Sequence, residues 1–232
     1  MIETVGEGRV RRVTIDRPDA RNALTWDGLD ALEEAIEAAE EPVLYLEGAG
    51  PAFCAGADLD VVAGLDRDGA EAFARRGQAV ARAIEESPSV VVAGIDGAAR
   101  GGGVELALAC DVRVATPMAT FGEPGVTFGI FGAWGGTVRL PNVLSEGDAL
   151  EFALSGRVVG AEEARRMGLV SRIEDEPRAV ADEIAENAAD ALTVVKRRVR
   201  DGADPESQER REVEAFGELV AAHADDVAAL RD

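Results

Sequence analysis

The stretch Arg100-Gly-Gly-Gly-Val-Glu-Leu-Ala-Leu-Ala-Cys-Asp111 joins three consecutive glycines to an apolar run that contains one acidic residue, Glu105. It follows residues 90–95, a β-branched run that predicts a strand. The apolar residues after the glycines predict a buried helix that begins near Gly102. Free N–H groups at such a helix start, with the helix dipole, favour negative charge. Glu105 lies three residues beyond Gly102, so we expect it on the same helix face, near any ligand bound there.

The same residues also allow a structural interpretation, in which the glycines only permit close packing and Glu105 interacts favourably with the helix dipole. A second segment favours a functional interpretation of these residues. Leu46-Glu-Gly-Ala-Gly-Pro-Ala-Phe-Cys-Ala-Gly-Ala-Asp-Leu59 again runs from a predicted strand through small residues into a predicted helix. Two loops of this kind can aim two backbone N–H groups at one oxygen atom.

Around these segments, short apolar runs alternate with helical patterns, which is typical of an α/β fold. Strands are predicted at residues 10–16, 42–47, 90–95, 111–115 and 169–173. Helices are predicted after Thr25, where apolar residues recur at spacings of three and four, and over a similar pattern that ends at Ser87-Pro88. Few strands are predicted beyond residue 145. We therefore expect one structural unit with an α/β core over residues 1–145, which contains the site, and a helical, oligomerisation region over residues 146–232.

The 232 residues include 45 acidic and 24 basic ones, for a formal net charge of −21. This balance makes nucleic acid and anionic membrane surfaces poor partners. Because 47% of the residues are hydrophobic and recur periodically, an acidic shell around a folded core fits better than a disordered chain. Lys196 is the only lysine, and arginine supplies the remaining positive charge. We interpret this surface as salt-adapted.

The sequence gives little support for a secreted, membrane-spanning, metal-binding or nucleotide-binding protein. No secretory signal pattern and no apolar stretch of about 20 residues is present, so a soluble, cytoplasmic protein is expected. His223 is the only histidine, which leaves little to build a zinc site or a catalytic triad, and no metal is expected. Cys54 and Cys110 are expected to be buried free thiols. No glycine pattern matches a dinucleotide-binding fingerprint or a P-loop.

Two further segments complete a pattern of four ordered motifs. They are Ile15-Asp-Arg-Pro-Asp-Ala-Arg-Asn-Ala-Leu-Thr25 and Phe121-Gly-Glu-Pro-Gly-Val-Thr-Phe-Gly-Ile-Phe-Gly-Ala-Trp-Gly-Gly136. With these, the chain resembles the crotonase, or enoyl-CoA hydratase/isomerase, superfamily from about residue 8 to residue 200. The resemblance implies a crotonase-like (ClpP/crotonase) fold of repeated ββα units with C-terminal helices.

The resemblance also implies an acyl-CoA thioester as substrate, with coenzyme A as part of the substrate and no separate cofactor. By motif position, the N–H groups of Ala57 and Gly102 would stabilise an enolate oxygen, and Glu105 would be catalytic. Asp58 is expected mainly to fix the loop or cap a helix, and Arg21 either to contact a CoA phosphate or to form a surface ion pair. The implied substrate-binding positions are Arg21, Ala23, Ala55, Asp58, Leu59, Gly101, Pro124, Gly125, Gly132 and Trp134.

One family feature is missing at Gly125. Family hydratases use a second glutamate in a Phe-Gly-x-Pro-Glu motif, whereas this chain has Phe121-Gly-Glu-Pro-Gly125. Glu123 stands two residues earlier, and in an extended segment it would share a face with Gly125. Pro124 stiffens this segment, and the family accepts varied residues here. Glu123 is therefore only a possible catalytic residue.

These motifs favour hydration of a 2-enoyl-CoA, with Glu105 activating water. Isomerisation of a 3-enoyl-CoA to a 2-enoyl-CoA is the first alternative, because moving a double bond formally needs only one base. A weakly catalytic or non-catalytic acyl-CoA binder is the second, motivated by Gly125. A decarboxylase or a thioester hydrolase on the same scaffold stays open, because an oxyanion hole serves several reactions.

Other features concern the pocket and the assembly. Trp134 replaces a small residue of the family motif, and it either reshapes the acyl pocket or packs between helix and sheet. The basic run 196–200 either contacts a CoA phosphate or forms a solvated helix face. The resemblance implies a homotrimer or a dimer of trimers, built by C-terminal helices whose apolar stripe is Val213, Phe216, Val220, Val227 and Leu230.

Overall fold

The computed structural model describes residues 1–229, and Leu230 lies outside them. The chain is organised as successive strand–strand–helix units, as predicted. The units are β1 (Ile2–Glu7), β2 (Val10–Ile15) and α1 (Trp26–Glu37); β3 (Val43–Gly48), β4 (Ala52–Cys54), α2 (Leu59–Ala63) and α3 (Arg67–Glu86); β5 (Val90–Ile95), β6 (Ala98–Arg100) and α4 (Gly102–Ala109); and β7 (Val112–Ala115), β8 (Thr120–Gly122) and α5 (Gly136–Val143).

The two strands of most units enter different sheets. The larger sheet has the order β1-β2-β3-β5-β7-β10 and is parallel except for β1, which pairs antiparallel with β2. The smaller sheet has the order β4-β6-β8-β9, in which β4, β6 and β8 run parallel. The chain therefore passes from the large sheet to the small one in each of three consecutive units, and then into a helix.

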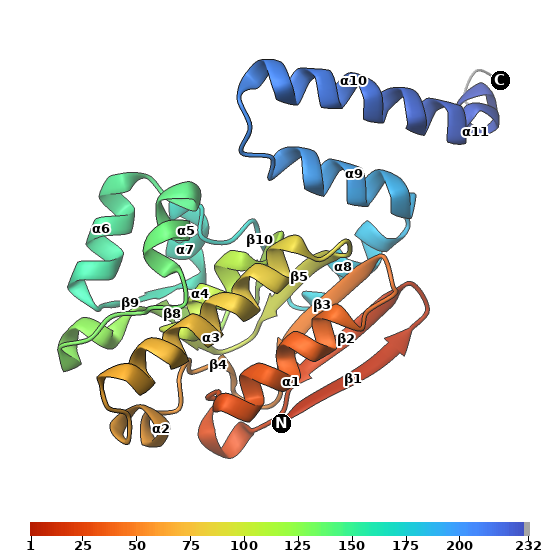
Figure 1. Cartoon of the computed structure of the whole chain (residues 1–232). Helices are drawn as coiled ribbons and strands as arrows, with labels where there is room; N and C mark the ends of the chain where they lie inside the picture. The colour runs from red at the N-terminus through yellow and green to blue at the C-terminus, as the bar shows by residue number, and fades with distance from the viewer. Residues whose placement is uncertain (230–232) are drawn as a thin grey trace.

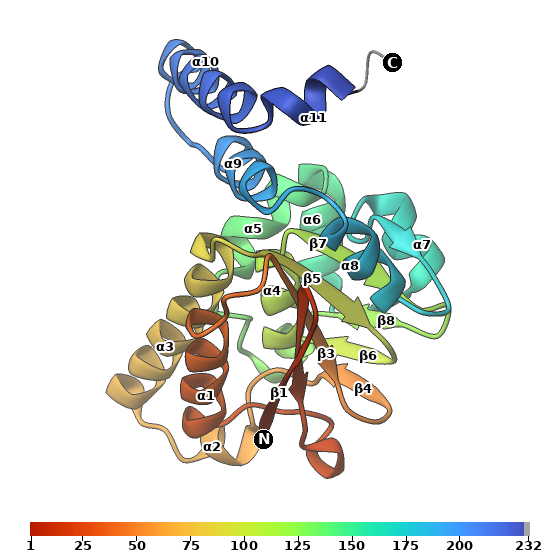
Figure 2. The same cartoon turned by 90° about the vertical axis from the view of Figure 1, so that its right-hand side faces the viewer.

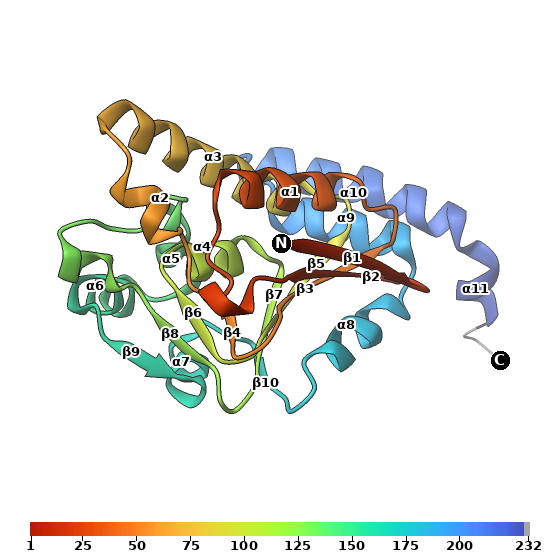
Figure 3. The same ribbon diagram turned by 90° about the horizontal axis from the view of Figure 1, so that it is seen from below.

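Helices cover both faces of the large sheet (Figure 3). On one face, α1, α3 and α4 pack into the main core, which includes Leu29, Leu32, Ile84 and Leu106. On the other face, α8 (Arg178–Ala185) packs Val180 and Ala181 against Tyr45 and other side chains of the sheet. All eight residues of α4 are buried, so this helix is enclosed on every side, as its uniformly apolar sequence predicts.

The five predicted strands are present, with ends that differ by a few residues. The structure adds β1, β4, β6, β8 and β9 (Val158–Gly160). Four of these five have three residues, too short for an alternating pattern to be detected in the sequence. The helices predicted after Thr25 and before Pro88 are present: Thr25 caps α1 by accepting a hydrogen bond from the Gly28 N–H, and α3 ends where Pro88 follows its C-cap, Ser87.

After α5 the chain is mostly helical: α6 (Glu146–Ser155), α7 (Ala161–Met167), α8, α9 (Ala189–Val199), α10 (Pro205–Ala222) and α11 (Ala224–Ala229). The short strands β9 and β10 (Arg172–Ile173) attach this part to both sheets. Helices α9, α10 and α11 form an arm that projects from the body (Figures 1 and 2). The division after residue 145 stays a prediction. No helix within residues 1–229 is long and apolar enough to cross a membrane.

Lys196 attaches this arm to the body. Its ammonium donates to the carbonyl oxygens of Ile84 at 3.1 Å and Ser89 at 2.8 Å, and lies 2.8 Å from the carboxylate of Asp111. Arg200, one turn later, pairs with the same carboxylate at 2.9 Å. The predictions for the run 196–200 are therefore wrong for Lys196, which is buried and faces the body, and a free phosphate contact at this residue is excluded by its three partners.

We expect Lys196→Met to destabilise the protein by about 3 kcal/mol, near the low end for breaking a buried ion pair, because Arg200 still pairs with Asp111. Arg197→Met, on the exposed side of the same helix, is the matched control and should change stability by less than about 0.5 kcal/mol. Urea unfolding followed by circular dichroism measures both. Equal midpoints for the two variants would contradict an anchoring role for Lys196.

Candidate functional site

The parallel strands β4, β6 and β8 end at the same edge of the small sheet. The loop 55–58 follows β4, Gly101 follows β6, and Glu123 follows β8. A Cβ atom added to Gly56 would lie 2.7 Å from the Arg100 carbonyl oxygen and 2.8 Å from the Gly102 nitrogen, so the first two loops are in close contact. Parallel pairing thus brings together segments that are about 45 and 20 residues apart in the sequence.

Ala57 and Gly102 carry the two candidate N–H donors. Within residues 1–229, neither N–H donates to another backbone carbonyl in the loops and turns, although neighbouring groups do: Leu24 N–H donates to Gly56 O at 2.8 Å and Asp58 N–H to Leu24 O at 2.9 Å. Both residues line a cavity of about 230 Å³. Gly102 is also the first residue of α4, so its N–H is one of those that a helix leaves without a partner inside the helix.

Glu105 enters this cavity from the first turn of α4, as predicted, and its side chain is buried. The N–H groups of Trp134 and Gly136 donate to its Oε1 atom at 2.9 and 2.6 Å. Burial raises the pKa of Glu105, and these two hydrogen bonds oppose the rise by stabilising the carboxylate. The other oxygen, Oε2, accepts no hydrogen bond from within the described chain.

Glu123 is a second buried carboxyl group in the same cavity. Its Oε1 atom is buried without a hydrogen-bond partner among residues 1–229. Burial, and then the negative charge of Glu105, raise the pKa of Glu123 to about 8. Glu123 therefore favours the protonated form at neutral pH, whereas the two N–H groups on Glu105 favour its carboxylate and limit the rise of its pKa.

Gly132 separates the two carboxyl groups. A Cβ atom at this position would lie 2.9 Å from Oε2 of Glu105 and 3.0 Å from Oε2 of Glu123. Contacts this short would push the carboxyl groups aside, so glycine at this position leaves both oxygen atoms free to face the same space. The structure thus places two carboxyl groups around one small volume, with one of them unpartnered.

The prediction that Glu123 and Gly125 share one face of an extended segment is wrong. The segment after Glu123 is a 3₁₀ helix, Pro124–Phe128, rather than an extended strand, so Glu123 and Gly125 do not share a strand face. Glu123 enters the cavity because it is the first residue after β8. Gly125 also lines the cavity, and a Cβ atom there would lie 3.0 Å from the Phe131 Cα, so the loop 130–132 packs closely on this position.

Trp134 is packed between two helices and also lines the cavity. Its ring lies where Cβ atoms of Gly77 on α3 and Gly102 on α4 would be, at 2.1 and 2.4 Å. It meets Phe73 edge to face at 5.9 Å between ring centroids. The ring therefore fixes the loop whose N–H groups hold Glu105. It lines the cavity, as one prediction for this residue has it, but it packs between two helices rather than between helix and sheet.

The remaining predicted positions divide into two groups. Ala55, Leu59, Gly101 and Pro124 line the cavity with the residues already described, and Leu59 is exposed at its mouth. Arg21, Ala23 and Asp58 do not line the cavity.

Arg21 and Asp58 support the loop 55–58 from behind, and the Ala23 carbonyl accepts from the Arg17 guanidinium that pairs with Asp58. The Arg21 carbonyl accepts from the Ala55 N–H at 2.9 Å. Asp58 caps α2 by accepting from the N–H groups of Asp60 and Val61 and pairs with Arg17, which confirms its predicted structural role. The Arg17 guanidinium holds the pKa of the Asp58 carboxyl below its usual range.

Sequence reasoning missed the apolar wall of the cavity and one cation behind it. The wall is formed by Leu65, Phe73, Phe128, Ile130 and Phe131, and the last three are exposed at the rim. The cation is Arg139 on α5, whose positive charge opposes the rise in the pKa of Glu105. The aromatic run 128–131 was a visible signal for the rim, but the placement of Arg139 depends on the packing of α5 against α4.

Known proteins resemble this chain over most of its length. The family described as enoyl-CoA hydratase/isomerase matches residues 6–226. The short-chain-enoyl-CoA hydratase of Clostridium acetobutylicum is 35% identical, over 93% of this chain and 87% of that protein. The crotonyl-CoA hydratase of Syntrophomonas wolfei is 38% identical over 72% of this chain and 66% of that protein.

A solved structure shows the same fold. The enoyl-CoA hydratase of Bacillus anthracis superposes with a TM-score of 0.90 and 32% identity, covering 99% of this chain and 94% of that one. The match spans both sheets and the C-terminal helices. With the family match and the relatives in agreement, this chain is a member of the crotonase superfamily of enoyl-CoA hydratase/isomerase enzymes.

Proposed function

We propose that this enzyme adds water to the double bond of a 2-enoyl-CoA, with Glu105 and Glu123 as the pair of carboxyl groups that the reaction needs. The observation that carries the proposal is the placement of the two buried carboxyl groups on either side of Gly132, with the pKa of Glu123 raised more than that of Glu105. Glu123 thereby takes the part that the missing glutamate at Gly125 would play. The acyl-CoA substrate class follows from the family.

The N–H groups of Ala57 and Gly102 are the proposed oxyanion hole. They are free of partners in loops and turns of the described chain and face the cavity that holds both carboxyl groups. Fixed donors contribute most when they are aimed at the place where charge develops, here the thioester oxygen as the enolate forms. Loss of one such donor typically lowers the rate by 10²–10³-fold.

The two carboxyl groups divide the proton transfers. The Glu105 carboxylate takes a proton from water while the water oxygen bonds to C3, and the electron pair of the double bond moves toward the thioester oxygen. Glu123, protonated at neutral pH, gives its proton to C2 as the enolate collapses. The product gains one water, and the pair again holds one proton, now on Glu105, which returns to Glu123.

Other proposed contacts concern binding. Ala55, Leu59, Gly101, Pro124 and Gly125 line the cavity and are proposed to contact the thioester and acyl group, whereas Ala23 and Asp58 lie outside it and both contact Arg17. Arg21 is exposed next to Ala55 and makes no ion pair among residues 1–229, so it is free to meet a CoA phosphate.

The first test is kinetic. We expect Glu105→Gln and Glu123→Gln each to lower kcat for hydration of crotonyl-CoA by about 10²–10⁴-fold, the usual contribution of a general acid or base. Loss of absorbance of the conjugated thioester measures hydration. The control is Glu34→Gln, an exposed residue of α1, which should retain the wild-type rate.

The same assay separates the alternatives. Full activity of Glu123→Gln would show that one carboxylate suffices and would remove the proposed acid. Conversion of a 3-enoyl-CoA to its conjugated isomer without hydration of crotonyl-CoA would favour the isomerase. Tight binding of crotonyl-CoA with no turnover of either compound would favour a binding protein.

A second test uses the pH dependence of stability. Because the pKa of Glu123 is raised in the folded state to about 8, the folded protein binds a proton that the unfolded chain has released. The stabilisation from this proton is complete below the usual pKa of a glutamate and is lost as the pH rises toward 8. Glu123→Gln should therefore be more stable than wild type at pH 8.5 and gain much less at pH 5, in thermal unfolding at both values. An equal difference at both values would show that Glu123 does not carry a raised pKa.

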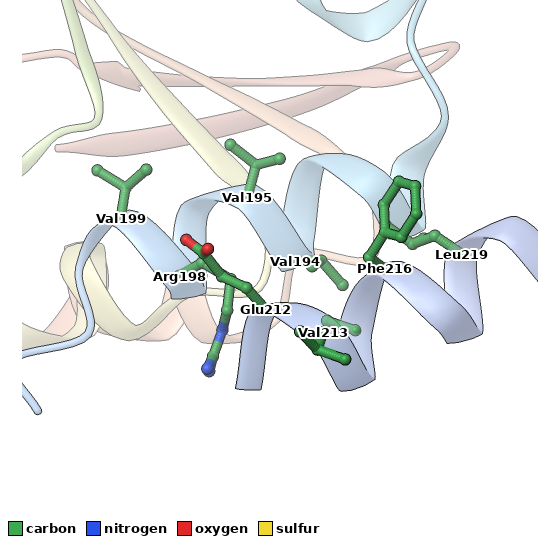
Figure 4. Close-up of a pocket in the computed structure, with 9 residues that line it drawn as sticks. Val194, Val195, Arg198, Val199, Glu212, Val213, Phe216 and Leu219 are labelled. Carbon is green, nitrogen blue, oxygen red and sulfur yellow. The ribbon is translucent and has the colours of Figure 1, made fainter. Parts of the chain in front are cut away.

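The projecting arm supports the proposed homotrimer or dimer of trimers. Helices α9 and α10 lie alongside one another and present a groove of apolar side chains (Figure 4). Val195, Val199, Val213 and Phe216 are exposed by 58–81% although they are large and apolar. Contiguous exposed apolar surface of this kind marks an interaction site, and a second copy of this chain is the proposed occupant.

Light scattering coupled to size-exclusion chromatography should give three or six times the chain mass. Val213→Asp combined with Phe216→Asp should dissociate the assembly, because two charges would be desolvated at the contact. Met118→Asp is the control, since Met118 is 78% exposed and lies on a turn far along the chain from the arm. A monomeric wild type would contradict the proposed assembly.

A further inference from the structure

The Glu105 carboxylate is held by a loop rather than by another side chain. Its Oε1 atom accepts hydrogen bonds from the N–H groups of Trp134 and Gly136, both of which belong to the segment just before or at the start of α5. The position of the carboxylate therefore depends on whatever fixes this segment. The ring of Trp134 fixes one side of it, between α3 and α4.

Arg139 fixes the other side. Its Nη1 atom donates to the carbonyl oxygen of Trp134 at 3.2 Å and to that of Gly135 at 3.5 Å. The same guanidinium forms a two-pronged pair with Glu85 of α3, in which Nε donates to Oε1 at 2.9 Å and Nη2 to the second oxygen. Arg139 thus binds the carbonyl side of the very peptide segment whose N–H groups bind Glu105.

Glu85 is itself held from two directions. Besides Arg139, it accepts from Nη1 of Arg200, the C-cap residue of α9, at 3.2 Å, and Arg200 in turn pairs with Asp111. The Arg139 side chain is 11% exposed, so its pair with Glu85 is less screened by solvent than the surface pairs of this protein. A planar guanidinium with two carboxylate bonds and two carbonyl contacts has little freedom to move.

We propose that Arg139, locked by Glu85, is a positioning residue for the Glu105 carboxylate and acts through the loop 134–136. Arg139 does not touch the cavity and is not itself a catalytic residue. It sets the direction of the two N–H groups, and through them the direction of the oxygen atom that takes the proton from water. This inference rests on the proposed function of Glu105.

The charge of Arg139 acts in the same direction as its geometry. The charged groups near Glu105 are Glu123 from the end of β8, Arg100 from β6 and Arg139 from α5, with Glu85 of α3 behind Arg139. Arg139 opposes the rise in the pKa of Glu105 that burial causes. Without this cation the pKa of Glu105 would rise further, and the base would become protonated at a higher pH.

The test compares Arg139→Gln with Arg139→Lys and with a matched control, Arg76→Gln. Arg76 lies on α3, is similarly buried and also holds two acidic partners, Asp30 and Glu33, but it contacts neither the loop 134–136 nor the cavity. Initial rates of crotonyl-CoA hydration are measured from pH 5 to pH 9 for each variant. Structure is followed through the fluorescence of Trp134 in a Trp26→Phe background, by acrylamide quenching.

For Arg139→Gln we expect kcat to fall about tenfold or more, KM to stay within about twofold, and the acid limb of kcat/KM to move to higher pH. Arg139→Lys should restore the acid limb, because it keeps the charge, but not the full kcat, because it lacks the planar fork. Arg76→Gln should leave kcat, the acid limb and the quenching unchanged. If Arg139→Gln does not fold, Glu85→Gln removes the lock and is expected to lower kcat in the same way.

Equal kinetics and equal quenching in Arg139→Gln and Arg76→Gln would overturn the inference. A fall in kcat with no shift of the acid limb and no change in Trp134 quenching would also overturn it, since the loop would then be undisturbed. If the wild type hydrates no enoyl-CoA, the proposed function fails, but quenching of Trp134 still decides whether Arg139 and Glu85 hold the loop.

Discussion

The parallel pairing of three very short strands is the constraint on which the site depends. β4, β6 and β8 have three residues each, yet they end side by side and place the loop 55–58, Gly101 and Glu123 at one edge. Strands this short are not stable alone. They are held in place by the helices that follow them in the chain and by the strands of the large sheet that come directly before them. The repeated ββα unit thus serves to bring backbone donors and acids from distant parts of the sequence into one cavity.

At this edge the protein buries two carboxyl groups, which are rarely found in a protein core. Within the part of the chain that the structure describes, Glu123 is buried with one oxygen atom that has no hydrogen-bond partner, and Glu105 is buried and accepts hydrogen bonds only from backbone N–H groups. Two carboxyl groups so close together cannot both ionise easily. The pair therefore retains one proton, which one of the two groups holds. Such an arrangement destabilises the fold at neutral pH, and its presence in a cavity with free N–H groups is typical of an active site.

The support for this pair extends away from the cavity. Trp134 and Arg139 hold the two sides of one loop, Glu85 holds Arg139, and Arg200 links Glu85 to α9. Lys196 and Arg200 meet again at Asp111, directly after the buried helix that carries Glu105. The arm that presents the apolar groove is therefore joined to the end of the helix that carries Glu105 by ion pairs rather than by apolar packing alone.

Most of the fold could be read from the residues. Short β-branched apolar runs identified the longer strands, and apolar residues at spacings of three and four identified the helices, because burial leaves a pattern in the sequence. The four ordered motifs identified the family and, through it, Ala57, Gly102 and Glu105 as candidate site residues. The three-residue strands left no such pattern, although they position the site.

Glu123 illustrates what could not be predicted from the sequence. Its residue type and its place beside Pro124 were visible in the sequence, but the extended geometry expected for the segment was wrong, since a 3₁₀ helix begins at Pro124. Whether a carboxyl group enters a cavity depends on the ends of strands and on the space left by residues such as Gly132, which come from other segments. The same holds for Arg139 and Lys196. Local patterns specify helices, strands and backbone donors, because these depend on neighbouring residues, whereas the pairing of charges depends on which segments pack together in three dimensions.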